Sequence, residues 1–219
     1  KVAVSYYPSY VEEEAIHAVD ETIPVKAITA YVYEEFLQNL NKDFAKREGL
    51  LFVGGFAHPP NADAVLWFAK EVFPKIREQI KVNFYIVGSK VTDEIKALEQ
   101  PGNGIIVKGF VSEEELADLY RNCRIVVVPL RYGAGVKGKV VEAIYNGAPI
   151  VTTSVGSEGI PDVEKVLLVK DQPDEFAETV VELYKDEKRL EDLAEKTQVY
   201  IREHFSIDAA WDVIKEDFE

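Results

Sequence analysis

Six short runs of almost unbroken apolar residues divide this chain. A strand with one face in water alternates apolar and polar residues, whereas a strand covered on both faces loses that alternation. Since the six runs lack the alternation, they indicate a parallel sheet that helices cover on both faces. The runs span residues 49–55, 82–88, 104–109, 123–130, 148–153 and 166–169.

The segments between the runs carry helical signals. Asn61 precedes an apolar pattern at helical spacing and is predicted to cap the N-terminus of that helix. Ser112 and Glu115 form a capping box, and Gly147 follows another helical pattern at the position of a C-terminal stop. Alternating strands and helices predict a doubly wound, mostly parallel α/β sheet of Rossmann-like type with right-handed crossovers. Three further helices are predicted over residues 172–186, 187–204 and 207–218.

The first 45 residues form a pattern of their own. They predict strand, helix, strand and helix in that order, with a break at Pro24 and the first strand within residues 1–7. The junction with the rest of the chain is expected near residues 45–49. The sequence contains no methionine, so we expect that chain upstream of Lys1 is missing.

The charge balance excludes several classes of partner. The 219 residues include 25 cations and 39 anions, a net charge of −14, which argues against a nucleic-acid surface and against anionic membranes. No apolar run is long enough to span a bilayer and no signal peptide is visible, so a cytoplasmic protein is expected. The single cysteine, Cys123, excludes an internal disulfide and is expected to be a buried apolar residue. Scattered histidines and the lack of a D-x-D motif predict no metal site.

One loop concentrates glycine and positive charge in this acidic chain. The stretch RYGAGVKGKVVEA, residues 131–143, holds the pattern G-x-G-x-x-G together with Arg131, Lys137 and Lys139. A second glycine pair, residues 54–55, follows the first apolar run. In doubly wound sheets, ligands bind beyond the carboxyl ends of the strands, where unpaired N–H groups at helix starts attract anions. The two loops together predict a phosphate-binding site.

Glu142 supports this interpretation, although two alternatives stay open. It lies one helical turn after Gly138 between apolar neighbours, where a carboxylate beside a phosphate would accept hydrogen bonds from a ribose diol. The plainer alternative is a glutamate stabilised only by the helix dipole, beside ordinary turn glycines and solvated cations. The glycine pattern also suits a dinucleotide site, but that site should stand at the first strand–helix turn, and here three strands precede it.

The residues quoted so far, taken in order, resemble a known family. Residues 129–160, PLRYGAGVKGKVVEAIYNGAPIVTTSVGSEGI, are similar to the donor-site segment of GT-B-fold glycosyltransferases of family 4, the retaining type. The segments LLFVGGFAHPPNADAVLWFAKEVFPKI, FYIVGS and VKGFVSEEELADLYRNCRIVVVP match the same family in the same order. The resemblance covers about residues 46–205, which would be the nucleotide-sugar-binding domain. Residues 1–45 resemble the end of that family's acceptor domain with its linker, and residues 206–219 resemble the helix that crosses back to it.

The resemblance implies a reaction and several site residues. A sugar would pass from a nucleoside diphosphate sugar to an acceptor hydroxyl with retention, without a metal or another cofactor. Glu142 would hold the ribose, whereas the family's preceding glutamate, which touches the donor sugar, is replaced by Ala134. The family's arginine and lysine after the first strand are also missing here, and Lys139 and Arg131 are the candidates to replace them.

Further donor contacts follow from the same resemblance. The base would lie near Phe110 and Val111, and Glu158 would line the pocket. No catalytic residue is assigned, because an acceptor-side base would lie in the upstream domain. The acceptor is expected to be a glycan or lipid-linked glycan, and this part alone is expected to bind the donor but transfer poorly. The remaining expected donor contacts are Gly55, Gly135 and Val136.

Two other functions stay open. Loss of the first glutamate and of the arginine–lysine pair would suit a non-catalytic nucleotide-binding module, and a full-length protein without turnover would favour it. The literal G-x-G-x-x-G pattern would suit an NAD-dependent oxidoreductase, and tight NAD binding without a response to sugar nucleotides would favour that function.

Overall fold

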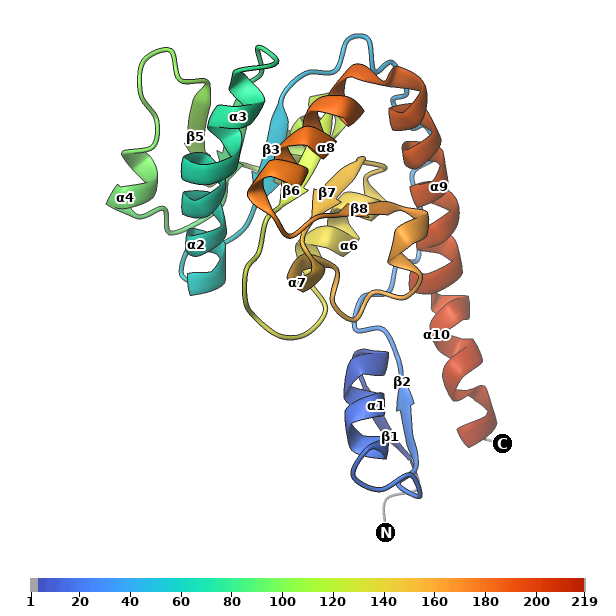
Figure 1. The fold of residues 1–219 in the computed structure, drawn as a ribbon. Coiled ribbons are helices and arrows are strands. Elements are labelled where there is room, and N and C mark those ends of the chain that lie inside the picture. Colours follow the sequence, from blue (N-terminus) through green and yellow to red (C-terminus); the bar gives the residue numbers. More distant parts are fainter. Residues whose placement is uncertain (1–3, 219) are drawn as a thin grey trace.

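A six-stranded, all-parallel sheet forms the centre of the computed structural model, which describes residues 4–218 (Figure 1). The strand order is β5-β4-β3-β6-β7-β8, and the absence of alternation in the apolar runs is explained by strands such as β6, all of whose residues are buried. The predicted doubly wound parallel sheet is thus confirmed. The strands are β3 (Leu50–Val53), β4 (Phe84–Val87), β5 (Ile105–Gly109), β6 (Ile125–Val128), β7 (Ile150–Thr152) and β8 (Leu167–Val169).

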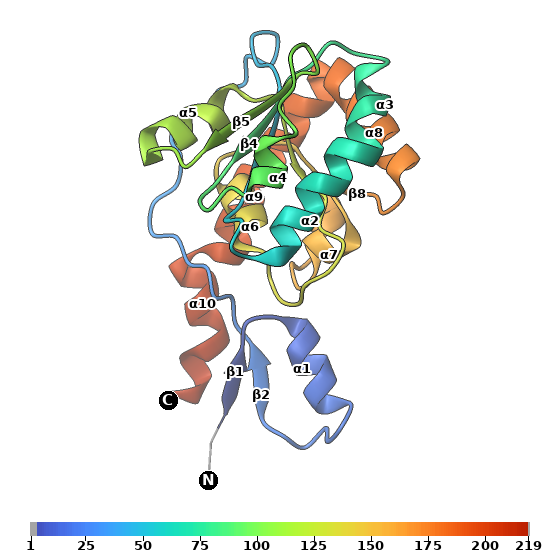
Figure 2. The same ribbon diagram turned by 90° about the vertical axis from the view of Figure 1, so that its left-hand side faces the viewer.

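Helices cover both faces of this sheet. In Figure 2, α2, α3 and α8 lie on one side of the sheet and α5 on the other, and α6 packs against α9. The π-helical turn Phe68–Val72 joins α2 to α3. The helices are α2 (Pro59–Trp67), α3 (Phe73–Arg77), α4 (Asp93–Lys96), α5 (Glu113–Asn122), α6 (Gly138–Tyr145), α7 (Ser154–Ser157), α8 (Pro173–Lys185), α9 (Glu187–Phe205) and α10 (Ile207–Ile214), with 3₁₀ turns at Val163–Lys165 and Lys215–Asp217.

The strand order places a switch point between β3 and β6. From β3 the chain continues to β4 on one side, and from β6 it continues to β7 on the other side. The two connections therefore diverge at the carboxyl ends of adjacent strands and leave a crevice, which is where open α/β sheets bind their ligands. Both glycine-containing loops predicted to bind phosphate start at this point.

Capping signals explain most helix boundaries. The Ser112 hydroxyl accepts a hydrogen bond from the Glu115 N–H at 3.2 Å, and Gly147 stands just after α6 with a φ of +67°. The prediction for Asn61 is wrong, because α2 begins at Pro59 and His58 holds the N-cap position. Two prolines at the helix start have fixed φ angles and no N–H groups that need a cap. Asn61 thus lies inside the first turn, and its side chain does not cap the helix.

The first residues form a small unit beside α10 (Figure 1). β1 (Ser5–Tyr7) and β2 (Val25–Ala27) pair in parallel, and α1 (Tyr10–His17) connects them. Lys26 forms a 2.7 Å ion pair with Asp217, which follows α10. The start of the predicted first strand, residues 1–3, lies outside the described residues.

The connecting segment (residues 28–49) contains no helix. The prediction of a second helix within the first 45 residues is therefore wrong. Its Phe36, Leu40 and Phe44 recur at helical spacing, but they pack onto the main core along an irregular path. The backbone N–H of Tyr33 donates to the carbonyl of Phe205 at 2.8 Å, so long-range partners replace helical hydrogen bonds.

Arg47 attaches the connecting segment to the main sheet. Its side chain is only 3% exposed, and its guanidinium stacks 4.3 Å from the ring centroid of Phe44. It donates to the carbonyls of Cys123 at 2.8 Å, Tyr120 at 2.9 Å and Asn41 at 3.2 Å, and burial lowers its pKa to about 10. One side chain therefore joins this segment to the carboxyl end of α5. Across residues 4–218 no helix is both long and apolar enough to cross a bilayer.

Candidate functional site

Two loops meet at the carboxyl edge of the switch point: the β3–α2 loop (residues 54–58) and the glycine loop (residues 131–137). The N–H of Gly54 donates to Val87 at 2.9 Å, and a side chain on Gly88 would overlap the Gly54 carbonyl. The β3–α2 loop is thus packed closely on the end of β4. Gly133 and Gly135 have φ angles of +112° and +82°, a left-handed conformation that costs glycine little.

A cavity of about 230 Å³ lies between the two loops. Its floor is the start of α6, whose N-cap position, Lys137, supplies no side-chain hydrogen bond to the helix. Free N–H groups at a helix start favour an anion. The lining residues are His58, Pro60, Asn61, Leu130, Tyr132, Gly133, Ala134, Val136, Lys137, Gly138 and Lys139.

Lys139 brings a positive charge into the wall of this cavity. Its ammonium group donates to the Asn61 side chain and lies 4.7 Å from the ring centroid of Phe52. Burial, followed by repulsion from Lys137, lowers the pKa of Lys139 to about 8. No carboxylate of residues 4–218 lies within ion-pair distance of it. The cavity wall therefore holds a half-buried cation that has no carboxylate partner among the described residues.

The other two cations of the sequence motif already have partners. Arg131 forms a bidentate pair with Asp63 of α2, with one contact at 2.9 Å, and its guanidinium lies 5.9 Å from the ring centroid of Trp67. Lys137 pairs with Glu158 at 3.1 Å; the Lys137 side chain is 10% exposed and that of Glu158 is 33% exposed. The structure thus brings Lys139, but not Arg131, into the cavity wall.

Glu142 lies half-buried on α6, one turn after Gly138. Burial raises the pKa of its carboxyl group, and the Tyr120 hydroxyl opposes this shift. The connecting segment also approaches this helix, since a methyl group on Gly138 would stand 2.8 Å from the Tyr31 hydroxyl. The Tyr33 ring stacks on Tyr145 at 4.3 Å. Sequence reasoning missed these tyrosines, and only the aromatic stretch at residues 31–33 could have suggested them.

The remaining predicted residues lie along the same carboxyl edge. Phe110, directly after β5, is 82% exposed, and Val111 beside it is half-buried. Gly55 faces β4, because a methyl group there would stand 3.3 Å from Ser89 Oγ. A path thus runs from Phe110 at the end of β5, past the β3–α2 loop, to the glycine loop at the end of β6.

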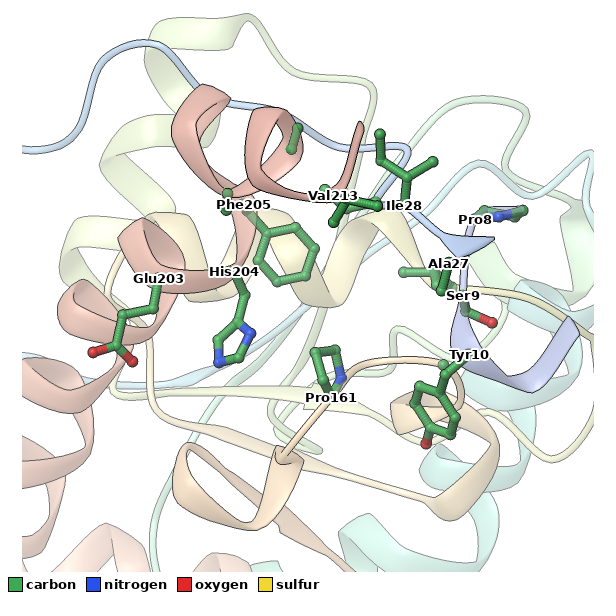
Figure 3. Close-up of a pocket in the computed structure, with 15 residues that line it drawn as sticks. Pro8, Ser9, Tyr10, Ala27, Ile28, Pro161, Glu203, His204, Phe205 and Val213 are labelled. Carbon is green, nitrogen blue, oxygen red and sulfur yellow. The ribbon is translucent and has the colours of Figure 1, made fainter. Parts of the chain in front are cut away.

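A second cavity, of about 240 Å³, lies on the other side of the glycine loop (Figure 3). In Figure 3, His204 and Phe205 of α9 face Ala27 of β2 and Ile28 of the connecting segment. Burial lowers the pKa of His204. Val136 lines both cavities, so the glycine loop forms a wall between them. Residues 4–218 contain no group of three or more histidine, cysteine or acidic side chains placed to hold a metal.

The sequence of this chain is similar to that of a longer bacterial protein. A protein of Klebsiella pneumoniae, described as an uncharacterized 44.6 kDa protein in the cps region, is 29% identical over 184 residues, which cover 80% of this chain. The match covers 45% of that relative, so the chain spans less than half of its length.

Solved structures show the same fold at low sequence identity. TarM of S. aureus, in a complex that contains UDP, superposes with a TM-score of 0.77 at 14% identity over 99% of this chain and 44% of its own. The pneumococcal O-GlcNAc transferase GtfA, in complex with UDP and GlcNAc, superposes with a TM-score of 0.70 at 20% identity over 97% of this chain and 44% of its own. The fold is that of the C-terminal half of a GT-B protein.

The family match covers the part of the chain that builds the crevice. Residues 47–186 match the family described as glycosyl transferases group 1. This range contains the β3–α2 loop, the glycine loop, Lys139 and Glu142, and it is more than half of the chain. The agreement of sheet order, loop positions and family match shows that this chain belongs to the group 1 glycosyltransferases.

Proposed function

We propose that this chain is the donor-binding part of a retaining glycosyltransferase, which transfers a sugar from a nucleoside diphosphate sugar to an acceptor hydroxyl. The observation that carries the proposal is Lys139, a half-buried cation without a carboxylate partner in residues 4–218, in the wall of a cavity between two glycine-containing loops. Residues 1–45 would be the end of the acceptor domain with its linker, and residues 206–219 the crossing helix. The relative from a cps region supports capsule or other polysaccharide synthesis.

Each part of the donor has a matching element in this proposal. The diphosphate would lie in the cavity, against the amides of the glycine loop, the start of α6 and Lys139. Glu142 would accept hydrogen bonds from the ribose hydroxyls, and the base would lie near Phe110 and Val111. A cavity of about 230 Å³ is small for a whole nucleotide sugar, so the nucleoside would extend along the open carboxyl edge.

The reaction requires the protein to stabilise the negative charge of a departing diphosphate. The bond between the anomeric carbon and the phosphate oxygen breaks, and both electrons leave with that oxygen, while the acceptor oxygen bonds to the same face of that carbon and its proton passes to the departing diphosphate. Preorganised amide groups and a buried cation stabilise such developing charge better than water does. Lys139 and the glycine loop would hold these groups in place before the reaction, so that no charged group would have to be reoriented during it.

Calorimetric titration with UDP, GDP, ADP and NAD tests the proposal. We expect one nucleoside diphosphate to bind selectively and Glu142→Ala to weaken it about tenfold, since the ribose hydroxyls lose a charged acceptor. Binding of NAD alone would contradict the proposal and favour an oxidoreductase. The replacement of the family's first glutamate by Ala134 favours one alternative, a non-catalytic nucleotide-binding module, which full-length protein would reveal by binding the donor without turnover.

The exposed ring of Phe110 gives a second test. Phe110→Ala is expected to weaken nucleoside diphosphate binding about fivefold, because stacking of an aromatic side chain on a base contributes about 1 kcal/mol or more. The fold should be unaffected, since the side chain is 82% exposed. Val199→Ala on α9, which removes another exposed apolar side chain remote from the cavity, is the control and should bind like the original protein. An equal loss of affinity for inorganic diphosphate would show that Phe110 does not contact the base.

A further inference from the structure

Asn61 of α2 has a buried amide side chain that neither caps its helix nor belongs to the predicted donor contacts. It is 6% exposed, lies in the first turn of the helix, and lines the cavity between the two loops. A buried side-chain amide costs free energy unless its oxygen and its nitrogen find hydrogen-bond partners. Both atoms of Asn61 have such partners, one on each of the two segments that enclose the cavity.

The amide of Asn61 connects Lys139 to the β3–α2 loop. Its Nδ2 group donates to the carbonyl of Gly55 at 2.8 Å, and its Oδ1 atom accepts a hydrogen bond from the Lys139 ammonium group. A carbonyl only accepts and an ammonium group only donates, so a single orientation of the amide satisfies both partners. The bond to Gly55 therefore keeps the oxygen of Asn61 directed at Lys139.

Gly54 leaves the space in which Lys139 and Asn61 meet. A methyl group on this glycine would stand 2.7 Å from Lys139 Nζ and 3.0 Å from Asn61 Cγ. The ring of Phe52 also lies against the ammonium group, with its centroid 4.7 Å from Nζ. Since Gly54, Phe52 and Asn61 are all uncharged, they hold the ammonium group in place without cancelling its charge.

We propose that Asn61 is a positioning residue for Lys139: it holds the ammonium group in the cavity wall and leaves its charge for the diphosphate of the donor. The identity of this ligand rests on the proposed function. An aspartate at this position would form an ion pair with Lys139 and cancel the charge that a diphosphate needs. It would also place a carboxylate oxygen against the carbonyl of Gly55, where two acceptors repel each other. Asparagine has the same shape, directs the lysine and adds no charge.

A double-mutant cycle between Asn61 and Lys139 tests the inference, with UDP, GDP, ADP and inorganic diphosphate as ligands at pH 7. Asn61→Ala should weaken diphosphate binding about tenfold, because the lysine loses the acceptor that directs it. Lys139→Met should weaken it more. Adding Asn61→Ala to Lys139→Met should cause no further loss, since Asn61 acts through the lysine. Losses that multiply in the double variant would overturn the inference, as would an unchanged affinity in Asn61→Ala.

A second readout needs no ligand. The Nζ signal of Lys139 is titrated by ¹⁵N NMR and identified by its loss in Lys139→Met. Asn61→Asp should raise the pKa of Lys139 above its value of about 8, because the new carboxylate stabilises the ammonium group. Asn83→Asp adds the same charge at an exposed position before β4 and is the matched control, which should leave this pKa unchanged. An unchanged pKa in Asn61→Asp would show that the two side chains do not meet and would also overturn the inference.

The outcomes separate this inference from the donor-site proposal. If inorganic diphosphate binds with the non-additive pattern and no nucleoside diphosphate binds, the donor-site proposal fails and the positioning role stands. If a nucleoside diphosphate binds and the losses from Asn61→Ala and Lys139→Met multiply, the positioning role fails and the donor site stands. Should Asn61→Ala not fold, Asn61→Asp keeps the shape of the side chain and should weaken diphosphate binding at least tenfold, with the nucleoside little affected. Equal losses for nucleoside and diphosphate in that variant would contradict the positioning role.

Discussion

Lys139→Met is expected to lower the affinity for the nucleoside diphosphate about a hundredfold and at the same time to stabilise the fold. The side chain is half-buried, lacks a carboxylate partner within residues 4–218, and donates to the Asn61 side chain in the wall of the cavity. Without an anion, the folded protein carries the cost of a desolvated charge. Methionine has a similar shape and no charge, so we expect unfolding to cost roughly 1 kcal/mol more, a gain limited by the loss of the bond to Asn61.

The measurement compares a nucleoside with its diphosphate. Calorimetry should show a large loss for the diphosphate and little change for the nucleoside, because Lys139 is expected to contact phosphate. Arg131→Met is the matched control, since Arg131 already pairs with Asp63 and does not line the cavity. Its effect on affinity should be less than about threefold. Equal losses for nucleoside and diphosphate in Lys139→Met would contradict the assigned role.

The lowered pKa of Lys139 adds a pH signature with a definite sign. In the folded protein this pKa is about 8, against an ordinary value of 10.5. Below about pH 8 the folded state bears the cost of the buried charge, and this cost is relieved as the pH rises from about 8 toward 10.5. Relative to Lys139→Met, the original protein should therefore gain stability over this range. Its affinity for diphosphate should fall over the same range as the cation is lost.

Arg47→Met is expected to lower the free energy of unfolding by about 3 kcal/mol, which is in the range for disrupting a buried charged network. Arg47 donates to the carbonyls of Tyr120, Cys123 and Asn41, so its loss removes the guanidinium donors of these acceptors. Urea denaturation measures the change. Arg121→Met is the control, since Arg121 is exposed and, among the described residues, its side chain pairs only with Asp118, at 3.4 Å. A loss below about 1 kcal/mol for Arg47→Met would show that water or other groups replace the guanidinium.

Several features of the site depend on pairs that are far apart in the sequence. Arg131 and Asp63 are separated by 68 residues, so the sequence offered no sign that this cation is neutralised outside the cavity. The same holds for Lys137 with Glu158, which are 21 residues apart in the sequence. Each pairing is created by the packing of two elements and leaves no local pattern.

The sequence by itself determined the alternation of strands and helices, the parallel sheet and the two glycine loops. These properties follow from local periodicity and from capping residues such as Ser112, which act over a few neighbouring positions. The tertiary structure decided that residues 28–49 form no helix, that α2 starts before Asn61, and that Lys139 alone of the three motif cations stays without a carboxylate partner in the described chain. Those outcomes depend on long-range burial and charge pairing, because a side chain's partner is set by which elements the fold brings together.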